Sequence, residues 1–265
     1  MKNYIKIIVF IFLISYAIIS CKFLEKDDTT ENKKQFSSIS AIDLLPTSTT
    51  KQIIVHDFYT LSYNEKFEQA EWVAYSLKKE NFKQNNFKRP YFVEDKKVTT
   101  HSADWRNYKK SGYDKGHLCP AGDMTFSKKA YEDTFLTSNI SPQKHDFNSG
   151  IWNRLEQKTR YWAEKYGTVF VISGGVLTSG LKTIGFEKVA VPNYFYKIIA
   201  SKSNGQIKVI AFLVPNEDSK KPLYTFVTSI DAIEKLTNID FFSKWEDSVE
   251  NKLESKSDYK DWSFN

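Results

Sequence analysis

The chain has 265 residues, with 20 Phe and 15 Tyr, so it is long enough to fold as one large domain or two small ones around a substantial apolar core. Only two cysteines are present, which excludes the disulfide framework that stabilises many small secreted proteins. The formal net charge of +6 is compatible with a polyanionic partner, but it is too small to identify one.

The first twenty residues have the pattern of an export signal. Two lysines precede an apolar run at residues 7–19, and the small residue Ser20 leads into Cys21. A basic start, an apolar run that is short for a spanning helix and a small final residue describe a secretory signal peptide. The four residues ending at Cys21 also resemble a bacterial lipobox, in which the cysteine is lipidated. We therefore expect residues 1–20 to be a lipoprotein signal peptide; the alternative is an uncleaved anchor with an incidental cysteine.

Residues 21–43 are polar, rich in charge and poor in large apolar residues, which predicts a flexible tether that begins at the lipidated cysteine. The tripeptide Lys-Asp-Asp at 26–28 resembles the tract that sends some bacterial lipoproteins to the outer cell surface. The expected location is the bacterial cell envelope, with a lipid on Cys21 holding the chain to the outer membrane in a surface-exposed or periplasmic orientation. Residues 44–265 then form the folded domain.

Strand patterns recur along this domain. Apolar and polar residues alternate over residues 52–63 and 72–77, and residues 168–172 form an apolar run that ends near two glycines. Residues 189–200 and 207–214 flank an Asn-Gly dipeptide, which is the strongest short signal for a β-hairpin. We expect strands in all five segments.

Two segments carry helical patterns. Residues 147–166 place apolar side chains at helical spacing and are followed by Gly167, a residue type that commonly ends helices. Residues 231–242 begin with Asp231, which we expect to be the N-cap. Because strands both precede and follow the main helix, the sequence predicts an α+β fold with a largely antiparallel sheet.

The segment from Gly112 to Glu156 concentrates residues suited to catalysis. His117 lies close to Lys115, and Asn148 and Glu156 lie near one face of the predicted helix. A neutral histidine can act as a general base, an amide oxygen suits Mg²⁺, and a lysine can stabilise charge on a phosphate. Together these residues fit metal-assisted phosphodiester hydrolysis. The alternative is structural: a buried, satisfied His117 and an Asn148 that only caps a helix.

Two ordered blocks resemble the DNA/RNA non-specific endonuclease family, which includes secreted bacterial nucleases and mitochondrial endonuclease G. The tetrapeptide Asp-Lys-Gly-His at 114–117 is similar to the family's Asp-Arg-Gly-His motif. The block Ser-Asn-Ile-Ser-Pro-Gln at 138–143, followed by Asn148 and Glu156, is similar to the family's metal-site block. Weaker similarity in the same order extends the resemblance to residues 44–243.

The resemblance implies a ββα-metal (His-Me finger) nuclease fold on a central, mainly antiparallel sheet. It implies that His117 is the general base, that Asn148 is the sole direct protein ligand of Mg²⁺, with Mn²⁺ as a substitute, and that Glu156 orients a metal-bound water. Asn139 would position His117 or the scissile phosphate, and Arg89 would contact the phosphate. The implied activity is hydrolysis of DNA and RNA, held by their phosphates without sequence preference, to products with 5′-phosphate ends.

Two positions depart from the family pattern. Lys115 stands where the motif has arginine, which keeps the charge but loses the bidentate fork of a phosphate clamp. Cys119 stands where a small residue is usual, and we expect a small buried hydrophobe; a zinc site with His101 or His145 would lack paired ligand spacing. Two other functions stay open: a non-catalytic nucleic-acid-binding module of the same fold at the cell surface, and a phosphodiesterase for small nucleotides. The sequence leaves the oligomeric state open.

Overall fold

The computed structural model describes residues 44–82, 85–203, 206–255 and 258–264. The predicted signal peptide, Cys21, the tether and the Asn-Gly turn lie outside the described residues. Among the helices that are described, none combines the length and the apolar character needed to cross a membrane.

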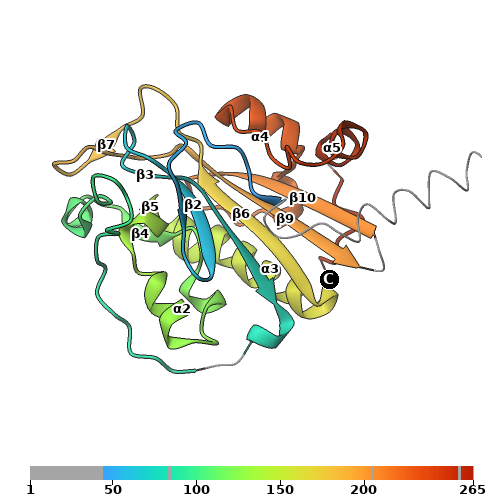
Figure 1. Ribbon diagram of the computed structural model, residues 1–265, viewed down its shortest axis with the longest axis horizontal. Coiled ribbons are helices and arrows are strands. Elements are labelled where there is room, and N and C mark those ends of the chain that lie inside the picture. The colour runs from blue at the N-terminus through green and yellow to red at the C-terminus, as the bar shows by residue number, and fades with distance from the viewer. Residues whose placement is uncertain (1–43, 83–84, 204–205, 256–257, 265) are drawn as a thin grey trace, which may run out of the picture. The chain divides into compact units, whose positions relative to one another are not determined.

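A seven-stranded sheet forms the centre of the domain (Figure 1), with the strand order β1-β2-β3-β6-β9-β10-β11. The pairs β1–β2, β2–β3, β3–β6, β6–β9 and β10–β11 are antiparallel, which confirms the predicted α+β fold with a mainly antiparallel sheet. Strands β4 and β5 form a separate two-stranded sheet, and so do β7 and β8. The strands are β1 (Ile53–Val55), β2 (Tyr59–Asn64), β3 (Gln69–Lys78), β4 (Asp114–His117), β5 (Ile140–Gln143), β6 (Thr168–Gly175), β7 (Thr183–Ile184), β8 (Val189–Ala190), β9 (Tyr194–Ser203), β10 (Gln206–Pro215) and β11 (Val227–Thr228).

The described residues contain fewer α-helices than strands. The longest of them, α3, packs against strands of the central sheet. Single-turn helical segments connect several of the other elements. The helices and turns are η2 (Lys79–Asn81), η3 (Trp105–Tyr108), η4 (Ala121–Asp123), α2 (Lys128–Asp133), η5 (Thr137–Asn139), the π-helical turn η6 (Phe147–Trp152), α3 (Asn153–Tyr166), η7 (Leu223–Phe226), α4 (Ile230–Thr237) and α5 (Asp247–Glu254).

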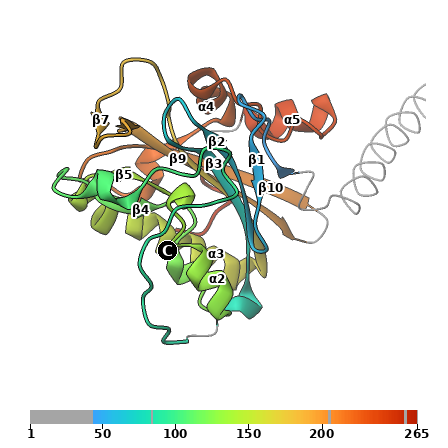
Figure 2. The ribbon, with the colours of Figure 1, turned by 60° about the vertical axis from the view of Figure 1, so that its left-hand side comes forward.

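The central sheet is covered on both faces, as Figure 1 and Figure 2 show: α3 lies against one face, and α4 and α5 lie over the other. Two neighbouring residues of β9 contact the two helical layers separately, because successive side chains of a strand point to opposite faces of the sheet. Phe195 packs on Phe147 and Trp152, at ring-centroid distances of 5.2 and 5.7 Å. The next residue, Tyr196, packs on Phe241 in the connection between α4 and α5, at 5.6 Å. The two helical layers are therefore separated by the sheet.

Two predicted strands are each interrupted. Residues 52–63 form the hairpin of β1 and β2, with a turn in which the backbone N–H of His56 donates to the carbonyl of Tyr59 at 2.9 Å. Residues 189–200 are divided into β8 and β9, and Pro192 lies between them. Proline has no N–H to donate to a strand ladder, which explains the break.

The main predicted helix is confirmed at its end and differs at its start. Gly167 ends α3 with a φ of +90°, and its N–H donates to the carbonyl of Ala163 at 2.9 Å. At the other end, residues 147–152 form a wide π-helical turn, and Gly150 has φ −97° and ψ −105°, outside the helical region. Regular α-helix therefore begins only at Asn153.

The later helix, α4, is shorter than predicted and has a different cap. Ser229 is the N-cap, and its side chain accepts from the backbone N–H of Ala232, so the prediction of Asp231 as N-cap is wrong. The helix ends at Asn238, which adopts the left-handed conformation with φ +55°. The helix therefore begins two residues earlier than predicted, and Ile230 and Ile233 in its first turn are buried.

Candidate active site

Strands β4 and β5 and the helical segment that follows them form a ββα unit. Asp114 lies opposite Gln143 and His117 lies opposite Ile140 in the antiparallel pair. Gly116 sits between these pairs, and a Cβ atom at this position would lie 2.1 Å from the side chain of Gln143. The glycine of the tetrapeptide is therefore required by close packing between the two strands.

His117 packs against the rings of Phe92 and Phe135, which we call the aromatic cradle. Its ring centroid is 5.5 Å from that of Phe92 and 5.1 Å from that of Phe135. The side chain is partly exposed, but Nε2 is buried and has no hydrogen-bond partner among the described residues. Burial and the nearby positive charge of Arg89 lower the pKa of His117 to about 3. The imidazole is therefore neutral at physiological pH.

Two cations share the cradle with this histidine. The guanidinium carbon of Arg89 lies 5.9 Å from the Phe92 ring centroid and 5.4 Å from that of Phe135. The Nζ atom of Lys115 lies 5.5 Å from the Phe92 centroid. The structure thus brings together three residues that the sequence predicted for the site, through rings that the prediction had not included. Two positive charges therefore lie on the same aromatic rings as His117.

The segment that carries Arg89 is held by backbone hydrogen bonds. The N–H of Val93 donates to the carbonyl of Phe135 at 3.2 Å, and the N–H of Thr137 donates back to the carbonyl of Val93 at 2.9 Å. Close by, Asp95 is buried and accepts from the hydroxyl of Ser138 at 2.6 Å. These contacts attach a loop distant in sequence to the segment that leads into β5.

Asn148 lies in the π-helical turn, half-buried, beside the start of β4. Its Nδ2 atom donates to Oδ2 of Asp114 at 2.9 Å, and Nδ1 of His145 lies 2.9 Å from the same oxygen. A carboxylate can only accept, so the amide nitrogen must face Asp114 and the amide oxygen is directed elsewhere. A neutral amide oxygen held in one orientation is a hard donor that suits a divalent cation such as Mg²⁺. The residues present therefore fit a metal at this turn.

Glu156 lies half-buried on α3 within a group of charged residues, of which Lys197 and Asp123 are fully buried. Burial raises the pKa of Glu156 to about 7, and the charge of Lys197 opposes that shift. Lys197 is fully buried on β9, and its Nζ donates to the hydroxyl of Ser173 at 2.7 Å. Arg160 pairs with Asp123 at 2.6 Å in the same group. Glu156 is therefore balanced between its ionised and protonated forms near neutral pH.

Asn139 is completely buried, and its amide binds only backbone groups. Its Oδ1 accepts from the N–H of Cys119 at 2.8 Å, and its Nδ2 donates to the carbonyls of Cys119 and Thr134, both at 2.9 Å. These contacts fasten the chain just after His117, which corresponds to the positioning role among the two that were expected. All the hydrogen bonds of the Asn139 amide go to backbone groups of Cys119 and Thr134, so the structure favours an indirect role through the position of His117.

Cys119 is confirmed as a small buried residue of the core. Two residues of the site were missed as site residues by the sequence analysis. Asp114 is the first residue of the Asp-Lys-Gly-His tetrapeptide. Its contact with Asn148 could not be predicted from the sequence, because that contact depends on the π-helical turn. Lys197 is a single cation in the apolar run Phe195–Ala200. A lone charge within an apolar strand is the sequence feature that could have identified Lys197 as a site residue.

Comparison with known proteins agrees with this geometry. Residues 38–248 match the family model described as DNA/RNA non-specific endonuclease. The chain is 36% identical over 209 residues to the mitochondrial nuclease EXOG of Danio rerio, covering 70% of this chain and 60% of that protein. It is 33% identical over 205 residues to mitochondrial endonuclease G of Homo sapiens, covering 72% and 69%. It is 31% identical over 213 residues to nuclease C1 of Cunninghamella echinulata var. echinulata, covering 74% and 84%.

The fold comparison gives the same result. A chain from the crystal structure of the EndoG/EndoGI complex aligns with a TM-score of 0.69 at 28% identity, covering 74% of this chain and 87% of that chain. The chain spans less than two thirds of the length of the EXOG nuclease that it resembles. The family match nevertheless covers the whole central sheet, the ββα unit and α4. The chain belongs to the DNA/RNA non-specific endonuclease family and has the ββα-metal nuclease fold.

Proposed function

We propose that this chain is a metal-dependent endonuclease that hydrolyses phosphodiester bonds of DNA and RNA without sequence preference and leaves 5′-phosphate ends. The observation that carries the proposal is the arrangement on one ββα unit of a neutral histidine and the amide oxygen of Asn148, which is left free because the amide nitrogen donates to Asp114. Two cations beside the same aromatic ring complete the set.

In the proposed mechanism, His117 takes a proton from the attacking water, which its neutral ring can do at physiological pH. Arg89 and Lys115 bind the phosphate and stabilise the negative charge that develops on it. Asn148 holds the divalent cation, which we propose to be Mg²⁺ with Mn²⁺ as a substitute. When bound, that cation supplies Lewis-acid neutralisation of the phosphate. Glu156, in its carboxylate form, accepts hydrogen bonds from water in the site.

The lack of sequence preference follows from the type of contact. Phosphate contacts orient a nucleic acid but carry no direct base information, and they weaken as salt competes for the phosphates. Lys115 offers a point charge in place of the bidentate fork of arginine, so the phosphate is held less rigidly on that side. We therefore expect cleavage of both DNA and RNA, with an activity that falls steeply as salt rises.

A digestion assay tests the proposal. The purified full-length chain is incubated with supercoiled plasmid or with a structured RNA, in Mg²⁺, in Mn²⁺ or in excess EDTA. Cleavage of both substrates in Mg²⁺, its loss in EDTA and ligatable 5′-phosphate ends are expected. Binding without cleavage in any metal would indicate the non-catalytic module instead. Hydrolysis of bis(p-nitrophenyl) phosphate with plasmid left intact would indicate the small-nucleotide phosphodiesterase.

We further propose that Cys21 carries a lipid after removal of residues 1–20, and that residues 21–43 tether residues 44–265 to the bacterial outer membrane. The support is the abrupt junction between an apolar run and a charge-rich stretch. One acyl chain binds membranes only marginally, so stable anchoring needs the several chains of a bacterial lipoprotein. Cys21→Ser should leave an uncleaved precursor or a soluble protein in fractionation with acyl labelling. A Cys21→Ser protein of mature size in the membrane fraction would refute the lipid anchor, and protease treatment of intact cells distinguishes the two orientations.

A further inference from the structure

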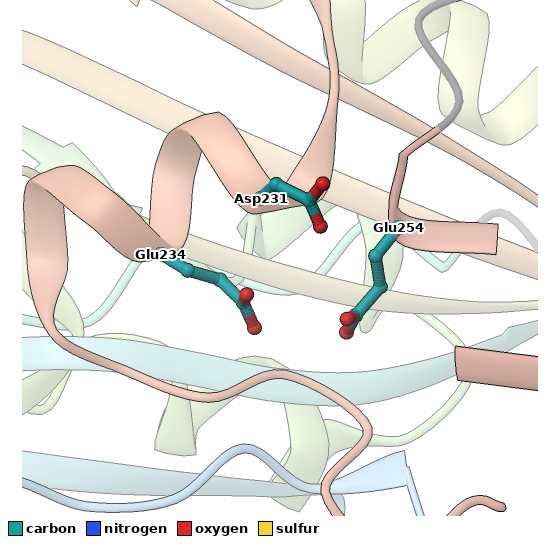
Figure 3. A group of neighbouring side chains, drawn as sticks. All are labelled: Asp231, Glu234 and Glu254. Atoms are coloured by element: carbon teal, nitrogen blue, oxygen red, sulfur yellow. The ribbon is translucent and has the colours of Figure 1, made fainter. Parts of the chain in front are cut away.

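Three carboxylates converge where α4 meets α5 (Figure 3). Asp231 and Glu234 project from α4, and Glu254 projects from the end of α5 toward them. One oxygen from each side chain lies within 4.8 Å of the others. This group, which we call the α4–α5 carboxylates, lies over the face of the sheet opposite to α3 and is separate from the candidate active site.

The charge of this group is not balanced. Glu254 is only 5% exposed, and its Oε1 atom is buried without a hydrogen-bond partner among the described residues. Burial raises the pKa of Glu254 to about 9, and the charged neighbours that add to the shift, Glu234, Glu250, Asp231 and Asp240, are all acidic. A buried carboxylate of this kind is costly unless a cation or a hydrogen bond compensates it.

Basic side chains of the same two helices do not supply the missing charge. Lys235 on α4 and Lys252 on α5 are exposed, and none of the ion pairs found in the described part of the chain joins a lysine or arginine to the α4–α5 carboxylates. Glu234 is held in place by the backbone N–H of Phe241, which donates to its Oε1 at 2.8 Å. That contact fixes the side chain and leaves its second oxygen available.

We propose that Asp231, Glu234 and Glu254 bind a divalent cation, Ca²⁺, that joins α4 to α5. Two oxygens that bind Ca²⁺ at about 2.4 Å can lie at most about 4.8 Å apart, and the three carboxylate oxygens lie within that limit of one another. Three carboxylates from two helices form an adaptable all-oxygen donor set, which suits Ca²⁺. Mg²⁺ demands near-ideal octahedral geometry and keeps most of its waters, so it suits this set less well.

The role of this cation is structural. Val249 and Leu253 bury the apolar side of α5, but the carboxylate of Glu254 opposes the docking of the same helix as long as its charge is unpaired. A cation that binds only the folded chain shifts unfolding to higher temperature by mass action. Because the sheet lies between this group and α3, Ca²⁺ at this position stabilises the fold without entering the reaction.

The experiment compares matched pairs of purified full-length proteins. The parent is Asn148→Ala, which removes the proposed catalytic ligand, so that Ca²⁺ bound there cannot be mistaken for the new site. To this parent are added Glu254→Gln, Asp231→Asn or Glu246→Gln, the last being a control at an exposed position just before α5. Equilibrium dialysis with ⁴⁵Ca²⁺ and thermal unfolding with and without Ca²⁺ are the measurements.

The parent and the Glu246→Gln control should bind one Ca²⁺ and unfold at a higher temperature in its presence. Glu254→Gln and Asp231→Asn should each weaken binding by at least tenfold and lose the shift. Burial holds the carboxyl group of Glu254 in its neutral form when no cation is bound, and Glu254→Gln replaces it by a neutral amide of similar shape, so the variant is expected to fold in the absence of Ca²⁺. Circular dichroism checks folding, and Asp231→Asn provides the same test at a half-buried position.

Equal ⁴⁵Ca²⁺ binding by the parent and Glu254→Gln, or a parent that binds no Ca²⁺, would overturn the proposal. Binding of Mg²⁺ with equal or higher affinity would overturn the choice of Ca²⁺. These readouts do not depend on nuclease activity, so a failure of the proposed function would not affect them. In an otherwise unchanged chain, Glu254→Gln should cleave plasmid in Mg²⁺ as fast as the wild type.

Discussion

The carboxylate of Asp114 accepts a hydrogen bond from the side-chain nitrogen of Asn148 at 2.9 Å, which directs the amide oxygen away from Asp114. Asp114 begins β4 and Asn148 lies in the π-helical turn after β5, so the contact joins the β and α parts of the ββα unit. His145 shares the same carboxylate oxygen. Asp114 is therefore a positioning residue for the proposed metal ligand.

Replacing Asp114 should weaken metal use more than it weakens the fold. In Asp114→Asn the acceptor is exchanged for a group that can also donate, so the orientation of the Asn148 amide is no longer enforced. Loss of such a supporting contact typically costs about 10–100-fold in metal affinity or activity. The Mg²⁺ concentration for half-maximal plasmid cleavage should rise accordingly. Asp146→Asn, at an exposed position in the same connection, is the control, and an equal Mg²⁺ requirement in both variants would contradict the role.

His117→Ala should abolish cleavage and preserve DNA binding. Loss of a general base typically slows a reaction by about 10²–10⁴-fold. The phosphate contacts of Arg89 and Lys115 are kept, so a gel-shift in EDTA should show little change in affinity. His101→Asn serves as the control, because His101 is exposed and asparagine tolerates its positive φ of 66°. Near-wild-type turnover by His117→Ala would show that another group acts as the base.

Asn139→Ala should act through stability. The substitution leaves the N–H and carbonyl of Cys119 and the carbonyl of Thr134 without their side-chain partner in the core. A buried polar group without a partner costs about 1–3 kcal/mol, so a decrease in the free energy of unfolding on the order of 3 kcal/mol is expected. Urea unfolding measures it, with the exposed residue Asn193 changed to Ala as the control. A variant with unchanged stability and slow turnover would instead support a direct phosphate contact.

Lys197→Met should move the acid limb of the pH–activity profile to higher pH. Glu156 acts as a carboxylate in the proposed mechanism, so activity falls as the pH drops through its pKa, which is about 7. The charge of Lys197 holds that pKa down, so its removal raises the pKa and the loss begins at a higher pH. Values of kcat/KM between about pH 5.5 and 9 would show this.

Two further variants test whether the charge is the cause. Lys202→Met changes an exposed lysine on the same strand and should leave the profile in place. Lys197→Arg keeps a buried positive charge and should shift the limb less than Lys197→Met. A Lys197→Met profile that overlays the wild type would show that Lys197 does not act on Glu156.

Features encoded locally were predictable from the sequence. The alternation of strands, the stop at Gly167 and the tetrapeptide that ends at His117 depend on residues close together in the chain. Local signals were less decisive where two neighbouring residues compete for the same role, as Ser229 and Asp231 do for the cap of α4. In the folded chain Ser229 caps the helix, and Ile230 and Ile233 at its start are buried.

The sequence by itself determined which chemical groups this protein has for the proposed reaction, since residue types and spacing predict a base, an amide ligand and cations. Only the tertiary structure decided their states. It placed Arg89 beside His117 on shared rings, bound the amide of Asn139 to backbone groups and brought the half-buried Glu156 under the influence of the charge of Lys197. Burial and contacts between distant segments control the pKa values and the orientations of these side chains. The spacing of residues along the chain does not reveal such burial or such contacts. For the same reason the α4–α5 carboxylates become a candidate cation site only when the two helices meet.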